Sequence, residues 1–308
     1  MVLTLLTIIG LSLFEVVCSI DNAIVNAKVL RTVSAKAKKW FLTWGLFFAV
    51  FIVRGLLPWI IVWAVNPHLG PIGAFTASFS SDPAIAHSIE QSVPVLFMSG
   101  GVFLLLLFFS WLFLENENYC IRGEYFFYRK GFWFNSIASL ILLFLTFITI
   151  KIDPNMTLGA AIGSTIFFIT HGFRERAKSM EEGLATSSRS DFSKLLFLEI
   201  LDTNFSIDGV LGAFAFTLSI PIILLGNGIG AVIVRQLTVG NIDRIKKYRY
   251  LENGAMYSIF FLGFFMVIES FGIPLPKFLP PIFTISAISF FLYKSIVRLK
   301  IEQSSKIV

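Results

Sequence analysis

The sequence predicts an all-α polytopic membrane protein with about nine transmembrane helices. Of its 308 residues, 56% are hydrophobic, only 14% are charged and 35 are phenylalanine, more than a soluble core of this length needs. The apolar residues occur in long runs, and about 20 such residues cross a bilayer as a helix. The basic surplus of +6 lies in short loops beside these runs, so it indicates contacts with anionic lipid rather than with nucleic acid.

Nine apolar runs define the expected spans. In chain order they are 2–27, 41–65, 93–114, 132–150, 157–173, 194–217, 221–239, 250–271 and 281–298. No basic segment precedes the first run and no small-residue cleavage site follows it, so we expect a retained span rather than a signal peptide. Loop 66–92 contains Pro, Gly and Ser, and we expect it to cover the outer face.

The distribution of Lys and Arg predicts the orientation of the spans. If the first span runs inward, 21 of the 25 Lys and Arg residues lie in cytoplasmic loops or in the C-terminal tail, with Lys194, Lys294 and Arg298 at cytoplasmic span ends counted among them, as the positive-inside rule requires. The N-terminus is then outside and the C-terminus is cytoplasmic. We expect a multi-pass protein of a bacterial-type cell (inner) membrane.

The spans divide into two membrane halves. Residues 1–173 contain five spans and residues 194–308 contain four. Residues 174–193 between them are polar, charged and rich in Ser, which is typical of a flexible cytoplasmic linker. The alternative is that this segment docks a partner.

One span of each half carries the same motif. Residues 15–21 and 202–208 both read acid-x-x-x-Ser-Ile-Asp, and segments 45–54 and 226–235 both have a Gly nine residues before an Arg. Under the predicted orientation the two motif spans run in opposite directions. The echoes therefore predict an inverted-topology repeat, which is typical of transporters whose site lies near the bilayer midplane.

The acids within the spans predict a cation site, because a charge at bilayer depth is costly and usually faces a functional cavity. Six of these acids are Glu15, Asp21, Glu199, Asp202, Asp208 and Glu269. Within the spans only Arg54 and Arg235 oppose them, and we expect these arginines to pair with acids or backbone carbonyls in structural or gating roles. An interior with surplus carboxylates favours a bound cation.

Helical spacing places most of the polar residues on two stripes. The stripes are Glu15, Ser19, Asn22 and Asn26 in the first half and Glu199, Asp202, Ser206 and Gly209 in the second. Asp21 and Asp208 lie about 120° away from the stripes in a regular helix. Either the helix is broken near Ser-Ile-Asp, or each Asp faces a neighbouring span.

The ligand types favour a hard divalent ion. Carboxylate and amide oxygens suit manganese, magnesium or calcium, whereas zinc or copper would recruit His and Cys. Cys18 and His171 stand alone in their spans, and we interpret them as a packing residue and an interfacial residue. The expected metal-binding set is Glu15, Asp21, Asn22, Asn26, Glu199, Asp202 and Asp208. The ion is expected to be transported, with no cofactor bound permanently.

These residues resemble those of the TerC family of integral membrane proteins, which is associated with tellurium resistance, and especially a branch of unknown function. The resemblance rests on FEVVCSIDNAIVNA, FLTWGLFFAVFIVRGLLP and FLEILDTNFSIDGVLGAFAF and extends over almost all of the spans. It implies manganese export through a site lined by Glu15, Asp21, Asn22, Asp202 and Asp208. The chain differs in having Asp202 where the family pattern suggests Glu, and Gly209 where the first half has Asn22.

The leading functional hypothesis is a divalent-cation exporter, with manganese as the expected ion, that works by alternating access between the halves. The alternative is a membrane anchor for cytosolic proteins of tellurite or metal stress, which would bind loop 174–193 and the other basic loops. An intramembrane enzyme is disfavoured because the sequence has no His-Glu-x-x-His pair and no nucleophile elbow.

Overall fold

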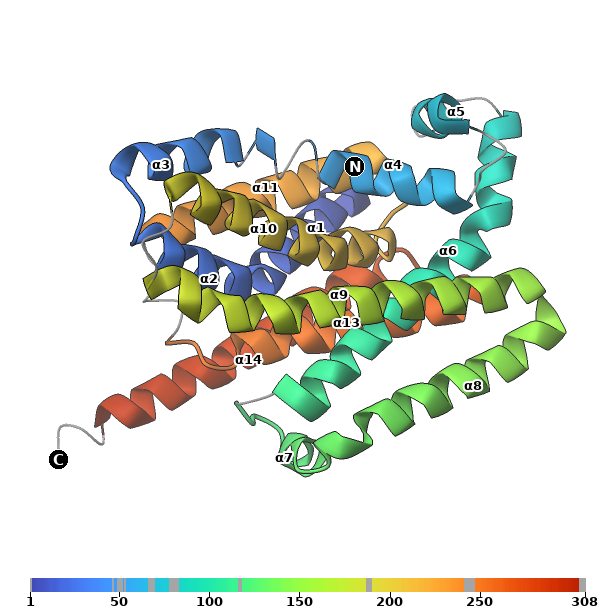
Figure 1. Cartoon of the computed structure of the whole chain (residues 1–308). Helices are drawn as coiled ribbons and strands as arrows, with labels where there is room; N and C mark the ends of the chain where they lie inside the picture. Colours follow the sequence, from blue (N-terminus) through green and yellow to red (C-terminus); the bar gives the residue numbers. More distant parts are fainter. Residues whose placement is uncertain are drawn as a thin grey trace.

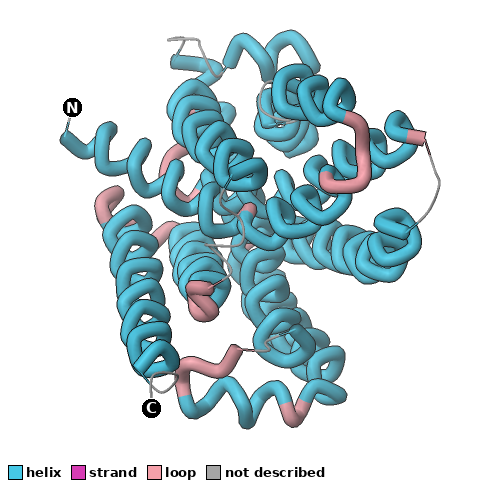
Figure 2. Tube along the Cα trace, turned by 90° about the vertical axis from the view of Figure 1, so that its left-hand side faces the viewer, coloured by secondary structure: helices cyan, strands magenta, loops and turns pink. Residues whose placement is uncertain are grey.

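The computed structural model is all-helical, with helices joined by turns and loops and no strand among the residues that it describes (Figures 1 and 2). The described residues are 2–45, 47–48, 52, 54–65, 70–77, 83–115, 118–186, 190–240 and 247–304. The first-half helices are α1 (Val2–Cys18), α2 (Ile20–Leu30), α3 (Ala35–Trp40), α4 (Arg54–Val65), α5 (Gly70–Ala77), α6 (Pro83–Ser110), α7 (Arg122–Tyr128), α8 (Phe134–Ile152) and α9 (Pro154–Thr186). The others are α10 (Asp191–Phe214), α11 (Ile220–Gly240), α13 (Leu251–Ser270) and α14 (Leu279–Ser304). Short π or 3-10 turns are η1 (Phe41–Gly45), η4 (Trp111–Glu115) and η5 (Gly131–Trp133).

Six of the described helices are long and apolar enough to cross a membrane. They lie at Ser92–Glu115, Gly131–Ile152, Pro154–Ala177, Ile220–Thr238, Leu251–Ser270 and Leu279–Ser304. The pair α1 and α2 passes the same test together, although the two helices are bent by 54°. α8 exposes large apolar side chains such as Leu143 and Phe144, which is a surface suited to lipid rather than to water.

The predicted count of nine spans is not confirmed in the described part of the chain. Predicted span 41–65 begins in the π-helical turn η1 and continues as α4, and residues 46, 49–51 and 53 between them lie outside the described residues. Predicted span 194–217 forms one unbroken helix, α10. That helix carries Lys194 and four acids, Asp191, Glu199, Asp202 and Asp208, so it does not qualify as a span by apolarity alone.

The centre of the bundle is α6, whose membrane-length segment is almost wholly buried. It packs most extensively against α9 and α13 (Figure 1). Gly163 of α9 lies so close to α6 that a Cβ atom there would overlap the carbonyl oxygen of Ser99. Small residues at this spacing let helix backbones approach closely in membranes, so glycine determines the α6–α9 contact.

A second group of helices positions the polar residues. α1 packs mainly on α11, and α10 contacts α1, α2, α4, α9 and α11. A Cβ atom at Gly226 of α11 would lie 2.6 Å from the Cβ of Leu11, and one at Gly230 would lie 2.6 Å from the Cβ of Glu15. Gly226 and Gly230 therefore allow α1 and α11 to approach each other closely.

The segment between the two halves is largely helical. α9 continues beyond the predicted span end at 173 as far as Thr186, and residues 187–189 lie outside the described residues. Ser190 then caps α10, because its hydroxyl accepts a hydrogen bond from the N–H of Ser193 (3.3 Å). Residues 174–186 thus form an extension of α9, which brings Arg174 onto the α10 surface.

Candidate functional site

The first motif lies at a bend between two helices. α1 ends at Cys18 and α2 begins at Ile20, with Ser19 at the junction. The Ser19 hydroxyl donates a hydrogen bond to Glu15 Oε1 at 2.8 Å. The backbone bonds from Ser19 N to Glu15 O and from Ala23 N to Ser19 O continue the i to i−4 pattern through the bend.

The second motif lies in a continuous helix. In α10 the Ser206 hydroxyl donates to the backbone carbonyl of Asp202 at 2.7 Å, so it bonds within its own helix. Asp208 lies on another side of α10 and faces α9. Of the two arrangements left open by the spacing, the first half has the broken helix and the second half has the Asp that faces a neighbour.

Glu15 is buried and paired. Its side chain is 1% exposed, and Arg54 Nη2 of α4 donates to Glu15 Oε1 at 2.6 Å. On the other side, a Cβ atom at Gly209 of α10 would lie 2.6 Å from Glu15 Oε2. A buried carboxylate without such a partner would be strongly disfavoured, so Arg54 is what allows Glu15 to lie in the bundle interior.

The Asp202 carboxylate is contacted by side chains from both halves of the chain. Asn22 Nδ2 of α2 donates a short hydrogen bond to Asp202 Oδ1, and Arg235 Nη2 of α11 lies 3.4 Å from Asp202 Oδ2. Arg235 also donates to the carbonyl oxygen of Phe41 at 2.9 Å, and its guanidinium lies 3.8 Å from the centre of the Phe41 ring. Glu199 Oε1 lies 3.7 Å from the same arginine.

These groups surround one polar cavity of about 10 Å³, which is close to the space of a single water molecule. Its described lining consists of Glu15, Ser19, Asn22, Asn26, Arg54, Asp202, Ala231, Val234, Arg235 and Thr238. The side-chain amide oxygens of Asn22 and Asn26 are buried without a hydrogen-bond partner, and so are both carboxylate oxygens of Glu199. The cavity therefore offers oxygen acceptors, whereas the two guanidinium groups supply its positive charge.

The predicted metal residues do not all meet in this cavity. Glu15, Asn22, Asn26 and Asp202 line it, and Glu199 lies beside it against Arg235. Asp21 lies in α2, but its side chain is outside the described part of the structure. Among the described residues, no group of three or more His, Cys, Asp or Glu side chains has the arrangement of a metal site.

Asp208 belongs to a separate polar cluster. Arg174 of α9 contacts both carboxylate oxygens of Asp208 and donates through Nε to Asn204 Oδ1 at 3.2 Å. The expectation that only Arg54 and Arg235 oppose the acids was therefore incomplete. Arg174 was missed because it follows the last apolar residue of its predicted span, and the only signal in the sequence was its position at that boundary.

The two remaining candidates have packing partners. His171 Nδ1 lies 3.3 Å from the Ser110 hydroxyl, and the His171 ring stacks on Phe167. Cys18 is half-buried against the hydrophobic core. Neither residue lines the polar cavity between Glu15 and Asp202, the Glu15–Asp202 cavity.

Comparisons with known proteins give one match. No curated protein and no solved structure matches the chain. A family described as "Protein of unknown function (DUF475)" matches residues 20–302, which include the last two residues of the first motif, the whole of the second motif, the buried Arg54 and Arg235, and Arg174. The chain belongs to the DUF475 family.

Proposed function

We propose that this protein is a membrane transporter that exports a divalent cation, with manganese the favoured ion, through the Glu15–Asp202 cavity. One observation carries the proposal. The acids that begin the two echo motifs, although 187 positions apart in the sequence, line the same small polar cavity. Buried carboxylates that converge from distant helices are typical of ion pathways in membrane proteins.

The pairing of the acids supports an inverted repeat. Arg54 ends the segment 45–54 and pairs with Glu15, and Arg235 ends the matching segment 226–235 and pairs with Asp202. The contacts that each motif makes with the acid of the other motif also correspond. Asn22 bonds Asp202, and Gly209, its counterpart in the second motif, lies against Glu15. We propose that the two halves are related in this way, with the N-terminus outside and the C-terminus cytoplasmic.

The chemistry of the lining favours a hard cation. The described lining side chains supply carboxylate, amide and hydroxyl oxygens and include no His or Cys. Such ligands suit Mn²⁺, Mg²⁺ or Ca²⁺. The resemblance to the TerC family favours manganese among these ions.

In this proposal Arg54 and Arg235 act as tethered counter-ions. A cavity of about 10 Å³ has no room for a hydrated cation, and the two guanidinium groups beside it would repel a bare one. The cation enters when the halves move apart and takes over the carboxylates as the arginines withdraw. When the cation leaves, the arginines return and neutralise the empty site, so the protein can reset without exposing unpaired buried charge.

The test is manganese flux in proteoliposomes that contain a metal-sensitive dye. We expect Glu15→Gln and Asp202→Asn to abolish flux, because each removes a charge and keeps the size of the side chain. Asp21→Asn and Asp208→Asn are expected to abolish flux as well, with normal membrane insertion. Glu302→Gln is the control, since Glu302 pairs with Arg249 and Arg298 at the surface. Full flux in both the Glu15 and the Asp202 variants would refute the proposal.

A membrane anchor for cytosolic stress proteins is the second candidate. A surface groove of about 430 Å³ lies between α3 and α10, with Trp40, Phe192 and Leu196 exposed in it. The groove adjoins the basic loop 28–40, which the orientation places in the cytoplasm. This function predicts that Phe192→Ser removes metal resistance in cells whereas Glu15→Gln leaves it unchanged, the reverse of what the transporter requires.

A further inference from the structure

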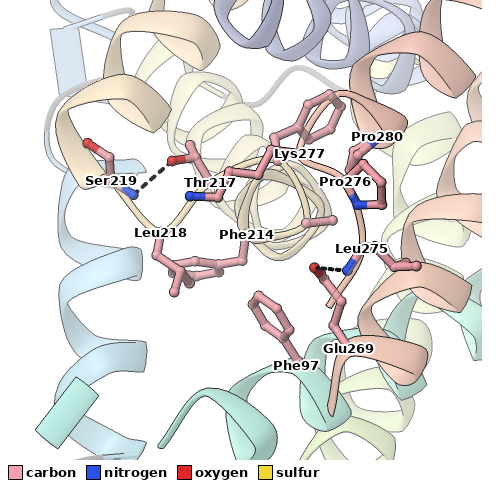
Figure 3. Close-up of a pocket in the computed structure, with 12 residues that line it drawn as sticks. Phe97, Phe214, Thr217, Leu218, Ser219, Glu269, Leu275, Pro276, Lys277 and Pro280 are labelled. Atoms are coloured by element: carbon pink, nitrogen blue, oxygen red, sulfur yellow. Dashed lines mark hydrogen bonds between the residues drawn. The ribbon is translucent and has the colours of Figure 1, made fainter. Parts of the chain in front are cut away.

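A pocket of about 350 Å³ opens at the end of the bundle where α10 turns into α11 and α13 is followed by the loop to α14 (Figure 3). Aromatic and aliphatic side chains form most of its wall, including Phe97, Phe214 and Leu218. Its charged groups are Glu269 at the end of α13 and Lys277 in the loop before α14. At about 30 Å³ per water molecule, the pocket has room for a cation with its first hydration shell.

Glu269 is held at the pocket wall. Its carboxylate accepts a hydrogen bond from the backbone N–H of Leu275 at 3.4 Å, and Figure 3 shows the Glu269 side chain directed toward the Leu275 backbone at the pocket wall. The charge pattern of the sequence places this end of the bundle outside, with Lys277 as one of only two basic residues in the outer loops. The pocket is thus at the side to which an exporter releases its ion.

A line of contacts between α1 and α10 leads from the polar cavity to this pocket. Gly209 lies against Glu15, and Gly212, nearly one turn further along α10, lies against the ring of Phe14. Phe216 follows, and it both lines the pocket and packs against Gly10 of α1. From Gly209 to Phe216 the chain advances about 10 Å at the rise of a helix.

Two phenylalanine rings lie between the polar cavity and the pocket along this line of contacts. Phe14 is fully buried and Phe216 is 5% exposed, and their ring centres lie 5.9 Å apart. Glycine makes room for both rings, because a Cβ atom at Gly212 would overlap Phe14 and one at Gly10 would lie 3.0 Å from Phe216. Apolar constrictions are known to gate ion pathways by excluding water.

We propose that this pocket is the release vestibule of the cation pathway, that Phe14 and Phe216 form its gate, and that Glu269 attracts the hydrated cation. The inference rests on the proposed transport function. Lys277 offsets part of the charge of Glu269, so the vestibule holds the ion weakly. Weak binding is what release requires, since a pathway must let its ion leave.

The first experiment blocks the pocket from outside. In a Cys18→Ala, Cys120→Ser background that transports manganese, a Leu218→Cys variant is treated with a bulky, membrane-impermeant thiol reagent. Leu218 lines the pocket and is 37% exposed. Ile273→Cys is the matched control, because Ile273 lies in the α13–α14 loop at the same end of the bundle, is 55% exposed and does not line the pocket. We expect flux to fall about tenfold or more after modification at position 218 and to remain unchanged after equal modification at position 273.

The second experiment tests the charge without altering the packing. Glu269→Gln should raise, by about threefold or more, the manganese concentration that half-saturates entry from the pocket side, because the local attraction of cations is lost. Glu302→Gln should leave that value unchanged. If the wild type transports manganese and both the modified Leu218→Cys and the Glu269→Gln proteins behave like it, the vestibule is wrong and the transport function stands. If the wild type moves no manganese, both proposals fail.

Discussion

Arg235 shows how much one buried guanidinium can organise. It contacts a carboxylate, a backbone carbonyl and an aromatic face at once, through Asp202, Phe41 O and the Phe41 ring. The planar guanidinium has the donors and the flat face for all three contacts, which a lysine lacks. The residue therefore joins α10, α11 and η1 around the cavity.

We predict that Arg235→Ala destabilises the protein by about 3–5 kcal/mol, because removing one partner of a buried pair leaves the other charge uncompensated. Arg235→Lys should lie between alanine and wild type, since it keeps the charge but not the fork. Thermal unfolding in detergent, followed by tryptophan fluorescence, measures the difference. Arg249→Ala is the control, because the Arg249–Glu302 pair is exposed and such pairs contribute at most about 1 kcal/mol. Equal unfolding temperatures for Arg235→Ala and Arg249→Ala would contradict the prediction.

Sequence reasoning identified Arg54 and Arg235 as partners for the acids because an arginine in an apolar run is rare and easily noticed. Arg174 has no such signal, since it follows an apolar run and continues into a charged segment. The structure shows that α9 continues past Arg174, and this continuation directs the Arg174 side chain to Asp208. The partner of a boundary residue depends on where its helix ends, and here no cap or breaker marks that point in the sequence.

The same limit applies to the elements. Ser-Ile-Asp occurs both at a helix break and inside a continuous helix, so the motif alone does not decide between them. The structure suggests a local cause. The Glu15 side chain is long enough to accept a hydrogen bond from Ser19, whereas Asp202 is one carbon shorter and Ser206 bonds the Asp202 backbone carbonyl instead. The Ser206 bond thus stays within the continuous helix α10, whereas the Ser19 bond goes to a carboxylate that also pairs with Arg54.

A glycine pair on α9 tests the helix packing. Gly163→Ala should destabilise the bundle, because the new methyl group would overlap the Ser99 carbonyl of α6 and overpacking typically costs about 1–3 kcal/mol. Gly172→Ala on the same helix meets nothing within 4 Å, so it should be neutral or stabilising by up to about 1 kcal/mol through helix propensity. Detergent unfolding of the two variants measures the contrast. If both shift equally, the α6–α9 approach is not what the structure describes.

Cys120, in the link between η4 and α7, provides a test by pH. Burial raises the pKa of its thiol, and the nearby Glu124 carboxylate raises it further. The thiolate is the reactive form, and a free cysteine has a pKa of about 8.5. We therefore expect alkylation of Cys120 to be slow at neutral pH and to rise only at a pH above that of an ordinary cysteine. A cysteine placed at the exposed neighbouring position by Ile121→Cys, in a Cys120→Ser protein, is the control. Identical pH profiles at the two positions would disprove the shift.

For the molecule as a whole, composition and run length predicted the all-helical class and the abundance of apolar helices, because those properties sum over many residues. The predicted number of nine spans is not confirmed among the described residues. The acids that make α10 chemically interesting also make it fail as an apolar span, and the bend at Ser19 divides the first span in two. The polar residues of the candidate site lower the hydropathy of the helices that carry them. Counting apolar runs is therefore least reliable for those helices.

The orientation is the whole-molecule prediction on which the inverted repeat depends. Almost all basic residues lie in loops that share one side of the membrane if the first span runs inward. Cysteines introduced at the exposed positions Lys36 and Met180 report on two of these basic segments, and a cysteine at the exposed Ile72 reports on segment 66–92, which has no Lys or Arg. Each is placed in the Cys18→Ala, Cys120→Ser background. We expect an impermeant maleimide to label Ile72→Cys in intact cells, and to label Lys36→Cys and Met180→Cys only after the membrane is opened. Labelling of Met180→Cys in intact cells would place the segment between the halves outside. The two motif helices would then no longer have the predicted relation to the membrane, and the argument for alternating access would lose its basis.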